Sequence, residues 1–176
     1  MKKIYLIASA KAEDFSAVTE DYERAICKQG YKDINTIGSY LLLRGISPDI
    51  IFSSYALRAQ QTAVELADRL KFNGVKYFLE ELYYSPYSDL VNIIKVQDNM
   101  MESIFIIGHN PQLNVVCNYF AVQKIAKIPS MGIVSLIFDT NNWSEVEQNK
   151  GNLDFFIYPK QFKYYMPKQI QAVLAR

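Results

Sequence analysis

The stretch Ile104-Phe105-Ile106-Ile107-Gly108-His109-Asn110-Pro111 decides the fold class of this 176-residue chain. Its four apolar residues, with no polar interruption, are typical of a central parallel strand that is covered on both faces. Asn110-Pro111 then predicts the start of a helix, because a proline at the first helical position loses no hydrogen bond. A buried strand followed by a helix is the repeating unit of an α/β sandwich.

The same alternation extends along the whole chain. Short apolar runs predict strands at residues 4–8, 49–52, 75–79, 104–107, 133–138 and 153–158. Helices with one apolar face follow candidate capping residues at Asp33, at Ser53 or Ser54, and at Ser88. The pattern therefore predicts one domain over residues 1–176, a three-layer sandwich whose mostly parallel central sheet has helices on both faces. In such sheets, ligands bind at the carboxyl ends of the strands.

Composition excludes several classes of protein. Lys and Arg total 19 and Asp and Glu total 18, so the net charge of +1 argues against a partner nucleic acid or membrane surface. Residues 2–10 imitate a short secretory signal, although we interpret them as the first strand. Cys27 and Cys117 lie far apart, so we expect no disulfide, metal or cofactor, and a reducing cytoplasm as the location. His109 is the single histidine, which excludes any mechanism that needs two.

Three segments with functional side chains follow predicted strands. Ala8-Ser9-Ala10-Lys11 follows the first strand, residues 53–62 follow the second, and Gly108-His109-Asn110-Pro111 follows the central one. Because the carboxyl ends of parallel strands meet at one edge of a sheet, we expect these segments to lie together.

Two side chains in these segments are candidate anion ligands. Arg58 lies in the first turn of its predicted helix, where the macrodipole disfavours a cation unless an anion is bound. Arg58 and the backbone N–H groups of that turn predict a phosphate site, and pairing with a local carboxylate is the alternative. His109 follows Gly108 at another helix start, so it is either a donor to the same anion or a structural histidine.

Further motifs occur in a fixed order along the chain. They are Asp21-Tyr22-Glu23-Arg24 with Gly30, Ser47 to Ser54 followed by Arg58-Ala59 and Gln61-Thr62, Glu81-Leu82-Tyr83, Gly108-His109-Asn110-Pro111, Trp143, and Pro159-Lys160. In order and spacing these motifs resemble the histidine phosphatase superfamily, in its SixA-type branch of phosphohistidine phosphatases. The resemblance runs nearly end to end and implies a phosphoglycerate mutase-like fold.

The first strand departs from the family pattern. The family has Arg-His there, and that histidine is the nucleophile which becomes phosphorylated while the arginine binds phosphoryl oxygens. This chain has Ala8-Ser9 instead, so the resemblance implies that Ser9 occupies the nucleophile's place. It leaves Arg58, His109 and Asn110 as phosphate-binding residues. Glu81 is either the family's acidic proton donor or a solvated carboxylate.

Loss of the imidazole has a large chemical consequence. A serine hydroxyl is a poor nucleophile unless a base or a metal activates it. Removing a covalent nucleophile costs on the order of 10³ to 10⁶ in rate. Lys11 replaces part of the lost positive charge, or it is an ordinary solvated lysine.

Three functions are consistent with this departure. The first is a pseudophosphatase that binds phosphate, or a phosphorylated small molecule or protein, without the family's catalysis. The second is an active hydrolase in which Ser9 attacks with His109 as base, or in which His109 is itself the nucleophile. The third is a non-enzymatic module that binds partner proteins through the tyrosine-rich segment at residues 83–87.

Overall fold

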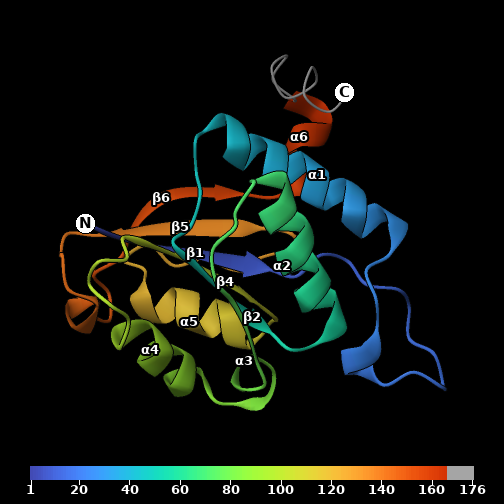
Figure 1. Cartoon of the computed structure of the whole chain (residues 1–176), viewed down its shortest axis with the longest axis horizontal. Helices are drawn as coiled ribbons and strands as arrows, with labels where there is room; N and C mark the ends of the chain where they lie inside the picture. Colours follow the sequence, from blue (N-terminus) through green and yellow to red (C-terminus); the bar gives the residue numbers. More distant parts are fainter. Residues whose placement is uncertain (166–176) are drawn as a thin grey trace.

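The computed structural model describes residues 1–165, which fold around one six-stranded sheet (Figure 1). In chain order the strands, α-helices and short 3₁₀ helices (η) are β1 (Lys2–Ala8), η1 (Asp21–Glu23), α1 (Lys28–Leu43), β2 (Ile50–Ser54), α2 (Leu57–Arg69), β3 (Lys76–Leu79), α3 (Glu81–Tyr84), α4 (Tyr87–Lys95), β4 (Ser103–Gly108), α5 (Gln112–Phe120), β5 (Ile133–Phe138), η2 (Trp143–Glu145), β6 (Asn152–Ile157) and α6 (Pro159–Tyr165). Residues 166–176 of the predicted domain lie outside the described residues.

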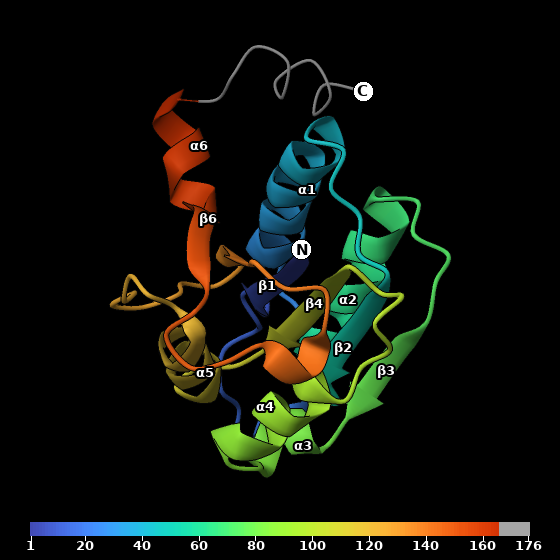
Figure 2. The same cartoon turned by 90° about the vertical axis from the view of Figure 1, so that its left-hand side faces the viewer.

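Helices cover both faces of the sheet and make the three predicted layers. Helices α1, α2 and α6 lie on one face, and α3, α4 and α5 lie on the other (Figures 1 and 2). The strand order is β3-β2-β4-β1-β5-β6. β3, β2, β4 and β1 are parallel neighbours, whereas β5 is antiparallel to both β1 and β6. The mostly parallel α/β sandwich predicted from the sequence is therefore confirmed.

The central strands are apolar on both sides, as the opening stretch predicts. Ile104 and Ile106 of β4 pack into the core beneath α4 and α5. Phe105 and Ile107 pack into the second core, beneath α1 and α2. None of the helices within residues 1–165 is long and apolar enough to cross a membrane.

Helix α1 begins earlier than its predicted capping residue. It starts at Lys28, so Asp33 lies within the helix, where its carboxylate accepts a hydrogen bond from Gln29 at 2.8 Å. The backbone N–H of Cys27 donates to the carbonyl of Lys11, and Gly30 packs closely against Lys11 and Ile26. Contact with the segment after β1 therefore sets the start of α1, and a local capping preference does not.

The other predicted caps also shift. Ser53 and Ser54 complete β2, where hydrogen bonds to the neighbouring strands hold them, and α2 begins after Ala56. Helix α4 begins at Tyr87 rather than after Ser88. Pro111 precedes the first residue of α5 instead of occupying the first helical position.

We predict that Gly30→Ala destabilises the protein by about 1–3 kcal/mol, the cost of overpacking a filled site. A β-carbon at Gly30 would overlap the carbonyl oxygen of Lys11 and lie 2.5 Å from Cγ2 of Ile26. Urea unfolding measures the change, with Lys32→Ala on the exposed side of α1 as the control. A Gly30→Ala variant as stable as Lys32→Ala would show that the segment after β1 moves away at no cost.

Candidate functional site

An open cleft of about 1070 Å³ lies at the carboxyl ends of β1 and β4. Ser9 and His109 directly follow these two strands and line the cleft, together with Lys11 and Asn110. The pairing of Ala8 with Gly108 in the parallel ladder sets the two segments side by side. The structure therefore brings together the first and third of the predicted segments, and the second meets the first where the backbone N–H of Ala10 donates to the hydroxyl of Thr62 at 3.0 Å.

Ser9 and His109 are in direct contact. The Oγ atom of Ser9 lies 3.2 Å from Nδ1 of His109, which is hydrogen-bonding distance. The backbone N–H of Ser9 donates to the carbonyl of Gly108 at 3.0 Å, which fixes the position of the serine. The side chain in the predicted nucleophile position therefore has an imidazole beside it.

The imidazole of His109 is uncharged at neutral pH. Burial, together with the nearby positive charge of Arg58, lowers its pKa from 6.5 to about 4, although Asp21 opposes this shift. Its Nε2 atom is buried and has no hydrogen-bond partner among the described residues. His109 therefore lines the cleft as a neutral group and adds no positive charge for an anion.

The guanidinium of Arg58 is held by a carboxylate of the protein itself. Its Nη1 donates to the backbone carbonyl of Asp21 at 2.7 Å, and its Nη2 donates to Oδ2 of Asp21 at 3.0 Å. The Arg58 side chain is 12% exposed and does not line the cleft. The alternative of a local carboxylate, which the sequence left open, is the arrangement in this structure.

Asp21 gathers three donors on one carboxylate. Oδ1 accepts from Nη1 of Arg24 at 2.8 Å, and Oδ2 accepts from the hydroxyl of Tyr83 at 2.6 Å as well as from Arg58. Burial by itself raises the pKa of Asp21, but hydrogen bonds from Tyr83, Arg24 and Arg58 outweigh it and lower the pKa to about 2. Asp21 is therefore ionised at any physiological pH, on a side chain that is 36% exposed.

Tyr83 connects this ion cluster to the cleft. The centre of its ring lies 5.5 Å from that of His109, edge to face, and 6.0 Å from Cζ of Arg58. The sequence motifs assign no role to Asp21 or Tyr83. The three-residue spacing of Asp21 and Arg24 is the one signal in the sequence for the ion pair.

Two predicted site residues, Glu81 and Asn110, do not have the surroundings expected of residues that bind a phosphate. Glu81 is exposed at the start of α3 and does not line the cleft, so the solvated alternative describes its position. Asn110 does line the cleft, but its Nδ2 donates to the carbonyl of Ile128 at 2.7 Å. Its amide therefore holds the segment before β5 against the end of β4.

The predicted tyrosine-rich segment separates into two parts. Tyr83 and Tyr84 pack edge to face at 4.4 Å, and Tyr84 shares a hydrogen bond with Tyr55, whose ring stacks on Tyr22. Tyr87 lies apart from them and packs against Tyr119 of α5 at 5.8 Å. In the first part, Tyr83 contacts the ion cluster through Asp21, whereas Tyr84 is 66% exposed.

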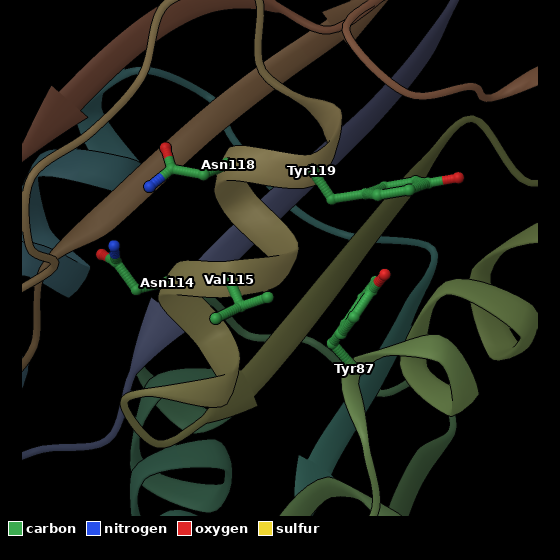
Figure 3. Close-up of a pocket in the computed structure, with 5 residues that line it drawn as sticks. All are labelled: Tyr87, Asn114, Val115, Asn118 and Tyr119. Atoms are coloured by element: carbon green, nitrogen blue, oxygen red, sulfur yellow. The ribbon is translucent and has the colours of Figure 1, made fainter.

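A second hollow of about 360 Å³ lies over α5 and the start of α4 (Figure 3). Tyr87 and Tyr119 line it beside Val115, while the side chains of Asn114 and Asn118 extend from α5 away from the two rings (Figure 3). Both asparagine amides already bind backbone groups at residues 125–128. Its five lining residues supply no carboxylate, imidazole or amine, whereas the cleft at Ser9 and His109 has an imidazole and several amines.

Metal ligation has no support in the part of the chain that the structure describes. No group of three or more His, Cys, Asp or Glu side chains gathers there as a metal site. Cys27 and Cys117 are both free thiols.

The fold matches solved structures, although no family model matches the sequence and no curated protein matches it. The protein histidine phosphatase SixA, solved with tungstate, superposes with a TM-score of 0.78 and 18% identity over 91% of this chain and 99% of that chain. A putative phosphohistidine phosphatase SixA from Agrobacterium tumefaciens superposes with a TM-score of 0.77 and 21% identity, over 90% of this chain and 98% of that chain. A phosphoserine phosphatase from Entamoeba histolytica, in complex with 3-phosphoglyceric acid, superposes with a TM-score of 0.59 and 14% identity, over 89% of this chain and 96% of that chain.

These matches define the class of fold. The chain has the α/β fold of the histidine phosphatase superfamily. Its fold superposes better on the two SixA structures, with TM-scores of 0.78 and 0.77, than on the phosphoserine phosphatase, with a TM-score of 0.59, in line with the resemblance of the sequence motifs.

We predict that the ring protons of His109 titrate with a midpoint near pH 4, which the NMR spectrum reports without overlap because the chain has one histidine. Between pH 6.5 and 4 the unfolded chain binds a proton that the folded chain does not, so stability must fall as the pH decreases through this window. A midpoint at or above 6.5 would show that the imidazole is solvated or paired with an anion.

Proposed function

We propose that this protein binds a phosphoryl group in the cleft beside Ser9 and His109 and lacks the covalent catalysis of histidine phosphatases. Its ligand is phosphate or a phosphorylated small molecule or protein. The SixA-like fold and the position of the cleft at the strand ends support the binding part of this proposal. Complexes of related folds with tungstate and with 3-phosphoglyceric acid support the same ligand class.

The contact between Ser9 and His109 carries the catalytic part of the proposal. A general base needs a pKa near the operating pH, and a pKa of about 4 makes His109 a weak acceptor for the serine proton. Serine nucleophiles also rely on a third group that orients the base, and no described residue binds Nε2 of His109. The pair therefore has the distance of a catalytic dyad without the basicity or the orienting partner.

A second function is favoured by the same 3.2 Å contact. In it, Ser9 Oγ bonds to phosphorus while its proton passes to Nδ1 of His109. The leaving alcohol takes the electrons of its P–O bond and receives that proton, and water then hydrolyses the phosphoserine. This route needs a neutral imidazole, which a pKa of about 4 provides. It predicts slow turnover that disappears in both Ser9→Ala and His109→Ala.

The expected location is the cytoplasm. The free thiols of Cys27 and Cys117 support a reducing compartment.

Restoring the family's residues tests the proposal directly. We expect the wild-type protein to release no phosphate from para-nitrophenyl phosphate or a phosphohistidine peptide above the buffer rate. Ala8→Arg with Ser9→His restores the nucleophile and a cation at the end of β1, and we expect a gain of at least about 100-fold. Ser9→His alone is the matched control, because it lacks the added charge.

The outcomes separate the hypotheses. Wild-type turnover at rates usual for phosphatases would refute the proposal. Slow wild-type turnover that Ser9→Ala abolishes would favour the serine route. A folded double variant that stays inactive would show that the pocket has changed beyond residues 8 and 9.

Asp21→Asn tests whether the carboxylate of Asp21 limits phosphate binding. Asp21 neutralises the charge of Arg58 and Arg24, and both Asp21 and Arg58 lie near enough to His109 to influence its charge state. Without the carboxylate this positive charge is unbalanced, so we expect inorganic phosphate to bind about tenfold more tightly. Isothermal titration calorimetry measures the change, and Glu20→Gln is the control for a lost negative charge on an exposed neighbour. Equal effects of the two substitutions would mean that Arg58 takes no part in binding.

A further inference from the structure

We propose that the cleft takes a small organic polyanion, with one phosphoryl group beside Ser9 and His109 and a second anionic group at a rim formed by Lys11, Lys127 and Lys160. We call these three residues the lysine rim. The inference rests on the proposed function, since it assumes that one end of the ligand lies at Ser9 and His109. It adds the substrate class, which the site residues alone do not give.

The charge of the cleft differs sharply from the charge of the chain. Four lysines and one aspartate line it among the residues that the structure describes, whereas the whole chain has 19 basic and 18 acidic residues. A concave wall of one sign concentrates oppositely charged ligands. The cleft is therefore selective for anions even though the protein is nearly neutral.

The lysine rim draws on three separate parts of the chain. Lys11 follows β1, Lys127 lies in the segment before β5, and Lys160 lies in the first turn of α6. All three side chains are exposed, so each amine is hydrated and holds an anion weakly by itself. Lys11 also interacts with the carboxylate of Asp33 in the same cleft, so Lys127 and Lys160 supply most of the positive charge for a group with several negative charges.

The inner end of the cleft is poor in positive charge. His109 is neutral, with a pKa of about 4, and Arg58 is paired with Asp21 outside the cleft lining. Ala8 stands where the family has an arginine. A ligand with one phosphoryl group at Ser9 finds little charge there, so the ligand that gains most carries a second anionic group toward the lysine rim.

The walls indicate an organic connector between the two anionic groups. Ile128, Pro129 and Phe162 line the same cleft as the lysine rim, beside the hydroxyl groups of Thr36 and Ser130. A volume of about 1070 Å³ is slightly above the roughly 300–1,000 Å³ that is usual for small-molecule sites, so the cleft has room for a ligand with two anionic groups. Apolar walls with a few polar groups suit a carbon skeleton better than an inorganic polyphosphate.

Calorimetry with two matched ligands tests the inference. The probes are 1,6-hexanediol bisphosphate and 1,6-hexanediol monophosphate, which differ by one phosphoryl group. We expect the bisphosphate to bind the wild-type protein about tenfold more tightly at low ionic strength. The advantage must shrink in about 0.5 M salt, because exposed ion pairs are screened.

Two double variants locate the second group. Lys127→Ala with Lys160→Ala must reduce the advantage of the bisphosphate to less than about threefold and leave the monophosphate affinity nearly unchanged. Lys32→Ala with Lys150→Ala removes the same charge from lysines that do not line the cleft, and must leave the advantage intact.

Each outcome decides between the two proposals. If the monophosphate and the bisphosphate bind equally, the polyanion inference is overturned and the proposed function stands. If neither ligand binds, the proposed function fails as well. An acidic phosphopeptide that binds more tightly than the bisphosphate, with the same dependence on Lys127 and Lys160, would overturn the small-molecule class in favour of a protein partner.

Discussion

The parallel pairing of β1 with β4 is the constraint on which the whole site depends. Residues Lys3 to Ala8 pair in register with Ser103 to Gly108, so the next residue of each strand, Ser9 and His109, must lie side by side. Burial of both strands between two apolar cores makes a shift of this register costly, because a one-residue slip would reverse every side chain. The 3.2 Å contact is therefore a consequence of the core.

The sequence predicts the architecture well because apolar runs report burial directly. β4 illustrates this, since an unbroken apolar strand has to be covered on both faces. Features that depend on distant contacts escape such reasoning. The start of α1 is set by the segment after β1, and the neutrality of His109 depends on burial and on Arg58, 51 positions earlier in the chain. Likewise, the position of Arg58 in the first turn of its helix indicates that an anion lies beside it. The sequence leaves open whether Asp21 or a ligand supplies that anion.

Asp21 explains why the interior of the site has little charge to offer. Its carboxylate takes hydrogen bonds from Arg24, Arg58 and Tyr83, which are donors of the kind that a phosphoryl oxygen would use. A phosphoryl group that binds Arg58 has to share it with a carboxylate whose pKa is about 2, and which stays charged at any physiological pH. The available positive charge lies instead with the lysine rim, where the amines are hydrated and their interactions are screened by salt.

Binding and turnover place different demands on the same residues, so one can be lost while the other remains. Turnover needs a nucleophile aligned with phosphorus and a base strong enough to take its proton, and both depend on individual atoms at Ser9 and His109. Binding needs only donors and positive charge around the anion, which several side chains supply together. Burial keeps the imidazole of His109 neutral and for the same reason makes it a weak base. Under the proposed function, a site built in this way holds a phosphoryl group more readily than it cleaves one.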